Sequence, residues 1–83
     1  MKISEKIVSL KILLEDRSDS WLVVHEIHTD LSKQSVKMSK ELIRFNLSEW
    51  VFDKIVAKRK RYYPWGKEDW EYRLIESFPD IAA

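Results

Sequence analysis

The chain has 83 residues, a formal net charge of +1 and no cysteine, and a chain of this length encloses one hydrophobic core and so makes a single domain spanning residues 1–83. An apolar fraction of 45% beside a charged fraction of 35% is typical of a folded chain and excludes a disordered one. The lack of cysteine excludes disulfides and thiolate metal sites and favours the cytoplasm, while apolar runs of at most four residues predict neither a leader nor a membrane-spanning segment.

The first half of the chain shows helical periodicity with one ambiguous stretch. We expect a helix over residues 3–16, because apolar side chains recur at helical spacing around the capping residue Ser4. The polar run 16–20 predicts a turn. Residues 21–31 have both a helical stripe and the β-branched and aromatic character of a strand. We favour a helix there, because neither flanking segment contains the glycine that tight hairpin turns need.

The second half also reads as helical. A helical stripe continues through residues 32–46, and Ser48 is placed to cap a further helix over about residues 49–62. That helix must end before the proline of the turn predicted at residues 63–66, because the residue before proline avoids helical geometry. A last helix is predicted from residue 67 to 77, with acidic residues in its first turn.

These elements predict a mostly α fold, a compact bundle of four or five short helices. The alternative is an α+β fold in which residues 21–38 pair as antiparallel strands.

Charge is strongly segregated along the chain. Residues 1–53 carry a net charge of −1, residues 54–67 carry +6 and residues 68–83 carry −4. The basic segment therefore forms either a local binding patch or a run that is neutralised within the fold by the acidic residues after it.

A basic-aromatic segment is the most informative stretch for function, because it combines four consecutive cations with three aromatic rings. Cations neutralise phosphates and aromatic rings stack on unpaired bases, and the same residue types anchor protein interfaces. Alternatively, the cations oppose a helix dipole and the rings close the core. The candidate binding residues for protein or nucleic acid are Lys58, Arg59, Lys60, Arg61, Tyr62, Tyr63 and Trp65.

Signals for catalysis and for cofactors are weak. His25 and His28 have a spacing that places both on one helical face, but no third histidine or cysteine completes a metal site. A single glycine cannot form a phosphate-binding loop, and the serines sit mostly at predicted helix caps. We therefore expect a protein that is not an enzyme and that holds no metal and no cofactor.

One segment resembles the helix-turn-helix family. It runs from Glu26 to Val36, and its sequence Leu-Ser-Lys-Gln-Ser-Val is similar to the opening of a recognition helix. The resemblance covers about a dozen residues and implies a DNA-binding role in which the second helix contacts bases.

These features lead to three functional hypotheses. Small size, four tryptophans and segregated charge favour a small accessory or inhibitory protein that binds a larger protein partner, in the style of phage and mobile-element proteins, with a homodimer also expected. The alternative is a DNA- or RNA-binding protein that uses the basic-aromatic segment 58–65 for phosphates and residues 32–40 for bases. A third hypothesis is an acidic mimic that uses Glu68, Asp69 and Glu71 to occupy a basic groove.

Overall fold

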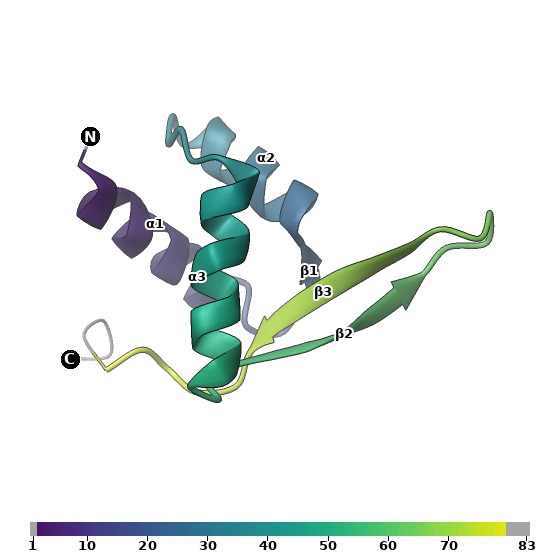
Figure 1. Cartoon of the computed structure of the whole chain (residues 1–83). Helices are drawn as coiled ribbons and strands as arrows, with labels where there is room; N and C mark the ends of the chain where they lie inside the picture. Colours follow the sequence, from purple (N-terminus) through teal and green to yellow (C-terminus); the bar gives the residue numbers. More distant parts are fainter. Residues whose placement is uncertain (1, 80–83) are drawn as a thin grey trace.

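The computed structural model describes residues 2–79, which form three helices and a three-stranded antiparallel sheet (Figure 1). In chain order the elements are α1 (Ile3–Asp16), β1 (Leu22–Val23), α2 (Val24–Lys33), α3 (Lys40–Phe52), β2 (Val56–Tyr62) and β3 (Glu68–Leu74). The sheet has the order β1-β3-β2, so the central strand is the last one in the sequence. The fold is therefore α+β, and the prediction of a bundle of four or five helices is wrong.

Helix α1 agrees with the range predicted from periodicity, but its cap does not. The N-cap is Lys2 rather than Ser4, and the backbone N–H of Lys2 donates to the carboxylate of Glu5 at 3.4 Å. Helix α2 begins in the same way, since the N–H of Val23 donates to Glu26 at 2.9 Å. In both helices a glutamate in the first turn satisfies a backbone donor that the helix leaves free.

Helices α2 and α3 both end in a left-handed residue that is not glycine. Ser35 has φ 61° and Lys54 has φ 62°. After α2, the N–H of Val36 donates to the carbonyl of Leu31, and after α3 the N–H of Ile55 donates to the carbonyl of Trp50, each at 2.9 Å. These are Schellman closures. They divide the chain at two places where the sequence contains no glycine to mark a helix end.

Strands β2 and β3 form a long hairpin that projects away from the helices (Figure 1). Their register pairs Val56 with Leu74 at the base and Tyr62 with Glu68 near the tip. The turn is closed by the N–H of Gly66, which donates to the carbonyl of Tyr63 at 3.0 Å. The short strand β1 pairs with the other edge of β3.

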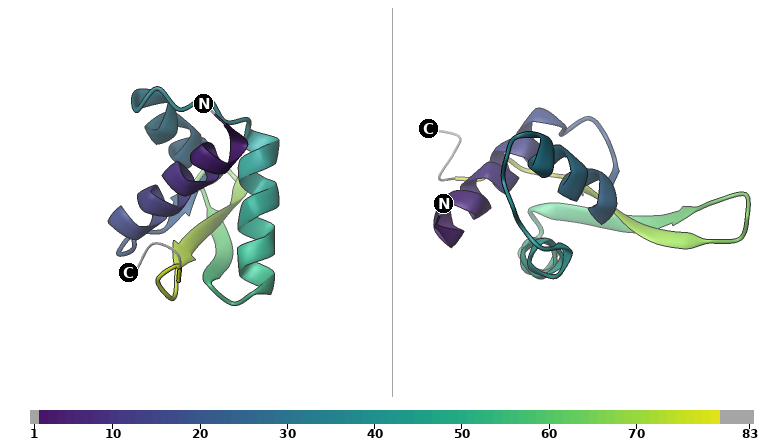
Figure 2. Two further views of the ribbon diagram at one scale, coloured as in Figure 1. Left: turned by 90° about the vertical axis from the view of Figure 1, so that its left-hand side faces the viewer. Right: turned by 90° about the horizontal axis from the view of Figure 1, so that it is seen from above.

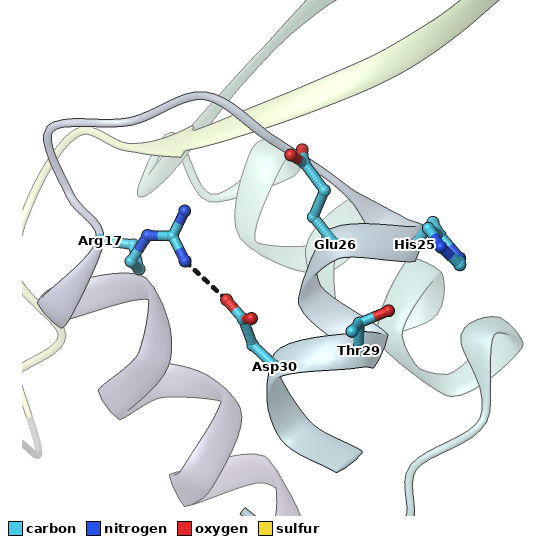
Figure 3. Close-up of a pocket in the computed structure, with 5 residues that line it drawn as sticks. All are labelled: Arg17, His25, Glu26, Thr29 and Asp30. Carbon is cyan, nitrogen blue, oxygen red and sulfur yellow. Dashed lines mark hydrogen bonds and ion pairs between the residues drawn. The ribbon is translucent and has the colours of Figure 1, made fainter. Parts of the chain in front are cut away.

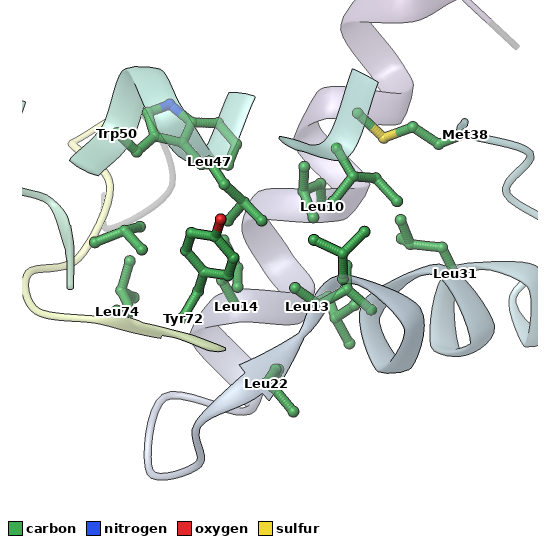
Figure 4. Close-up of a cluster of buried hydrophobic side chains, with 14 of the residues drawn as sticks. Leu10, Leu13, Leu14, Leu22, Leu31, Met38, Leu47, Trp50, Tyr72 and Leu74 are labelled. Atoms are coloured by element: carbon green, nitrogen blue, oxygen red, sulfur yellow. The ribbon is translucent and has the colours of Figure 1, made fainter. Parts of the chain in front are cut away.

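The core lies between the three helices and the base of the hairpin (Figure 4). Leu10, Ile27 and Leu47 have no exposed surface, and each comes from a different helix. On the hairpin, Val56, Tyr72 and Leu74 are buried and pack into the same cluster. One face of the hairpin base is thereby held against α3, and the outer part of the hairpin, with Tyr62 and Trp65, is exposed to solvent (Figure 1).

The segment after β3 returns to the helical body, as the two further views show (Figure 2). Glu15 of α1 accepts a hydrogen bond from the N–H of Phe78 at 2.9 Å, and the Phe78 ring packs edge-on to Trp50 at 4.8 Å. Phe78 is 1% exposed. The end of the described chain is thus anchored to the core. Within residues 2–79 no helix combines the length and the apolar character needed to cross a membrane.

Three predicted elements are corrected by the structure. Residues 21–31 contain the two residues of β1 followed by most of α2, so the helix favoured there is confirmed from Val24 onward. The alternative is correct in its α+β class and wrong in placing antiparallel strands over residues 21–38. The helix predicted over 49–62 ends at Phe52, and Ser48 lies inside α3 rather than at its cap. The range 67–77, predicted as a helix, holds strand β3.

Candidate functional site

The basic run of the hairpin is divided between two faces, because side chains alternate along a strand. Lys58 and Lys60 share a face with buried Val56, and this is the face that packs on α3 at its base. Arg59 and Arg61 lie on the opposite face. The four cations predicted as one site therefore form two pairs with different surroundings.

The arginine pair is held by a single buried carboxylate. Glu71 on β3 is 5% exposed, and it accepts hydrogen bonds from Nε of Arg59 and from Nε of Arg61, each at 2.6 Å. Burial raises the pKa of the Glu71 carboxyl, but the hydrogen bonds from the two arginines outweigh this effect and hold its pKa below the ordinary value. Glu71 is therefore charged and fully engaged at neutral pH.

Further contacts connect the arginine pair to the body of the protein. Arg61 donates to the carbonyl of Trp21 at 3.0 Å and lies 3.3 Å from the carboxylate of Glu26 on α2. The guanidinium of Arg59 stacks over the indole ring of Trp21 at 4.1 Å from its centroid. Burial lowers the pKa of Arg61, and the hydrogen bond to Glu71 and the charge of Glu26 more than offset this, so its pKa is raised. These contacts fix the direction in which the hairpin leaves the body.

The lysine pair is more loosely held. The ammonium groups of Lys58 and Lys60 lie over the ring of Trp70 at 4.4 and 5.4 Å from its centroid. Lys60 also forms an exposed ion pair with Glu68 at 3.1 Å. Exposed pairs of this kind contribute little, so an incoming phosphate can replace the carboxylate. Both lysines therefore remain able to bind an anion.

Helix α3, which packs on strand β2, carries two further cations. Burial raises the pKa of the Tyr72 phenol, and the positive charge of Arg44 on α3 acts in the opposite direction. Tyr72 is the cross-strand partner of Lys58. Lys40 precedes Arg44 by four residues and so lies on the same side of the helix. We call Lys40, Arg44, Lys58 and Lys60 the basic face.

The sequence did not single out Arg44, and it marked Lys40 only as the last residue of the range 32–40 predicted to contact bases. The sequence signal for these two residues was a pair of cations four residues apart that begins directly after Ser39. Ser39 is the N-cap of α3, and its hydroxyl accepts a hydrogen bond from the N–H of Leu42 at 3.2 Å. Residues 32–40, which were predicted to contact bases, instead form the end of α2, the turn at 34–39 and the first residue of α3. Two helices joined by a turn are present, but the second helix starts at Lys40, nine residues after Leu31, where the resemblance places the opening of the recognition helix.

The aromatic residues of the predicted site lie at the tip of the hairpin. Tyr62 is 71% exposed and Trp65 is 72% exposed, so neither ring closes the core. Tyr63 and Trp65 stack on each other, with ring centroids 4.9 Å apart and an angle of 21° between their planes. Trp70 is also exposed, so two of the four tryptophans, Trp65 and Trp70, lie largely in solvent.

The other candidate groups do not form a site with distinct chemistry. Glu68 and Glu71 pair with cations of β2, so the acidic cluster proposed as a mimic is neutralised within the hairpin. His25 is exposed, and it lines a shallow pocket with the ion pair of Arg17 and Asp30 (Figure 3). Among residues 2–79 no cluster of three histidine or acidic side chains is arranged to hold a metal ion.

The outward surface of α3 carries two aromatic residues. Phe45 is 54% exposed and Phe52 is 83% exposed, and they lie seven residues apart, close to two full turns. Glu41 and Glu49 flank them on the same side of the helix. The N-terminal half of α3 therefore carries Glu41 and Phe45 as well as the two cations of the basic face, whereas the outward surface of its C-terminal half carries Glu49 and Phe52.

Comparisons of the sequence and the structure with known proteins give no match to a protein-family model, to a curated protein or to a solved structure.

Proposed function

We propose that the protein binds duplex DNA, with the N-terminal half of α3 directed into a groove and the hairpin placed on the adjacent backbone. The observation that carries this proposal is the hairpin register, which places Lys58 and Lys60 on the face that packs on α3 at its base, and α3 itself carries Lys40 and Arg44. Two consecutive elements, α3 and β2, each contribute a pair of cations to this proposed surface. A continuous cationic surface suits the regular phosphate backbone of a duplex.

The order of the elements supports this proposal at the level of the fold. Helix α2, the turn at residues 34–39 and helix α3 make a helix-turn-helix, and a β-hairpin follows directly, as in the winged members of that class. In helix-turn-helix proteins the N-terminal residues of the second helix contact base edges. The order of the elements supports DNA binding by analogy with that class.

The residue types at the start of α3 fit direct contact with bases. Lys40 and Arg44 can donate to guanine, Glu41 can accept from the amino group of cytosine, and Phe45 can contact the methyl group of thymine. Lys58 and Lys60 on the hairpin carry only charge and suit phosphates. Arg59 and Arg61 are assigned a structural role, because both are engaged by Glu71.

The low overall charge is consistent with modest affinity. The hairpin, residues 56–74, carries six basic and three acidic side chains, which leaves a local net charge of +3 in a chain of net charge +1. Nonspecific affinity grows with the number of neutralised phosphates. We therefore expect binding that is easily weakened by salt and that depends on base contacts for its strength.

A binding assay with matched charge variants tests the proposal. Fluorescence anisotropy with a labelled duplex at about 50 mM salt should show that Lys58→Gln with Lys60→Gln weakens binding by at least about fivefold. The control is Lys2→Gln with Lys6→Gln, which removes the same charge from the start of the chain and should change affinity by less than about twofold. Equal loss in both variants would contradict a localised DNA-binding surface.

A second candidate function is binding of a larger protein partner, and it is favoured by the high exposure of Phe52. A ring that is 83% exposed contributes little to the core, and exposed aromatic residues are typical anchors of protein interfaces. Capture experiments from a nuclease-treated lysate, with the wild type and with Phe45→Ser and Phe52→Ser, test this function. A defined protein retained by the wild type and lost with both variants would support it, and identical capture profiles would contradict it.

A further inference from the structure

The tip of the hairpin is a rigid turn. The N–H of Tyr63 donates to the carbonyl of Lys67 at 2.8 Å, and the N–H of Gly66 donates back to Tyr63 at 3.0 Å. Pro64 restricts its own φ angle, and Gly66 adopts φ +87°, a value that favours glycine. The backbone at the tip is therefore fixed before any ligand arrives, which reduces the entropy lost on binding.

This turn displays a preformed aromatic stack. One face of the Trp65 indole is covered by Tyr63, and the 72% exposure of Trp65 leaves the other face accessible. The stack lies at the end of the hairpin farthest from the helices (Figure 1), so the core cannot account for it. Lys67 adds a positive charge 6.0 Å from the centre of the Tyr63 ring.

The chemistry of the tip selects a nucleobase as its ligand. An open indole face, with Lys67 at the neighbouring Tyr63 ring and on a hairpin of net charge +3, suits a flat aromatic group attached to a negatively charged backbone. Stacking also tolerates any sequence, because every base has a π-face. In a continuous duplex, however, each base already has a neighbour on both faces.

We propose that the Tyr63–Trp65 stack packs on a base exposed where a duplex is interrupted, and that the protein therefore prefers DNA with unpaired bases or a duplex–single-strand junction over a continuous duplex. This inference rests on the proposed DNA-binding function and specifies its substrate class. The basic face holds the duplex, and the tip recognises the interruption.

The test compares two labelled DNAs by fluorescence anisotropy: a continuous duplex, and the same duplex with unpaired nucleotides at its centre. The wild type should bind the interrupted DNA at least about fivefold more tightly, given the usual strength of base–aromatic stacking. Trp65→Ala should remove this preference and leave affinity for the continuous duplex within about twofold. A 2-aminopurine at the unpaired position should be quenched by the wild type and much less by Trp65→Ala.

The control variant is Phe52→Ala, which removes an equally exposed ring from α3 and should keep the preference intact. Equal affinity for the two DNAs would overturn this inference and leave the proposed function standing. Equal loss of affinity for both DNAs in Trp65→Ala would also overturn it, because the tip would then act on continuous duplex. Failure to bind either DNA, or a protein captured through Trp65 in place of DNA, would overturn the proposed function as well.

Discussion

Replacing Glu71 with glutamine tests whether this carboxylate holds the hairpin to the body. Glu71 is 5% exposed and accepts charge-assisted hydrogen bonds from Arg59 and Arg61 at 2.6 Å. Hydrogen bonds to charged groups contribute about 1.5–3 kcal/mol each, but the Arg59 side chain is 57% exposed and its share is screened. The free energy of unfolding should therefore fall by about 2 kcal/mol, which corresponds to a melting temperature lower by roughly 10 °C.

The pH dependence of the same variant provides a second test. The pKa of Glu71 is lower in the folded protein than in the unfolded chain. Its stabilising contribution is therefore complete above the unfolded value of about 4.3 and is lost as the pH falls through the lower folded value. Since glutamine does not titrate, the difference in stability between the wild type and Glu71→Gln should be largest near pH 7 and should shrink in acid.

Urea denaturation followed by tryptophan fluorescence at several pH values measures both effects. The control is Glu68→Gln, because the exposed pair of Glu68 with Lys60 should change stability by no more than about 0.5 kcal/mol. If Glu71→Gln is as stable as the wild type at pH 7, or if the difference between them does not depend on pH, Glu71 does not hold the arginine pair as described.

Two further predictions concern the helix ends. We expect the free energy of unfolding to rise by about 1 kcal/mol in Lys54→Gly and in Ser35→Gly, because both residues adopt left-handed backbone angles that glycine accepts more readily. Thermal melts measure this change, and a loss of stability would refute the Schellman closures. Ser39→Ala should lower the free energy of unfolding by about 1 kcal/mol, because it removes the N-cap of α3. Ser48→Ala should be neutral or slightly stabilising, because Ser48 lies inside the helix. If urea denaturation shows the reverse order, the cap lies at Ser48 instead.

The sequence predicted the first helix correctly because its apolar spacing is regular and nothing competes with it. The ends of α2 and α3 were not predicted, because neither helix end is marked by a glycine. Ser35 and Lys54 take up left-handed angles, so the chain turns at positions where the composition gave no break. Residues 32–46 were consequently read as one helix, and α3 was not separated from the segment after it.

The hairpin was missed for a different reason. Between Val56 and Tyr62 the alternating positions toward α3 are filled by Lys58 and Lys60 rather than by apolar residues, so the period of two is absent. Tertiary contacts stabilise the strand instead, through Trp70 and Glu71 on its neighbour. The signal that remained was a proline and a glycine in a four-residue turn, which was read as a break between helices.

The candidate site was partly predictable from the sequence. The sequence marked the basic-aromatic segment as unusual, and two of its three rings, Tyr62 and Trp65, are exposed in the structure. Composition alone could not show that the arginines and the lysines of this segment lie on opposite faces. Only the register of the hairpin brings Arg59 and Arg61 to the carboxylate of Glu71. The contribution of Arg44 likewise depends on the packing of α3 against β2.

The salt dependence of affinity for duplex DNA tests the central claim most directly. Four cations on the basic face predict a slope of about −3 to −4 in a plot of log affinity against log salt concentration, since each neutralised phosphate contributes about −0.9. The slope should become shallower by about 2 in Lys58→Gln with Lys60→Gln and stay unchanged in Lys2→Gln with Lys6→Gln. No measurable binding at low salt, or the same slope in all three proteins, would contradict DNA binding through α3 and the hairpin.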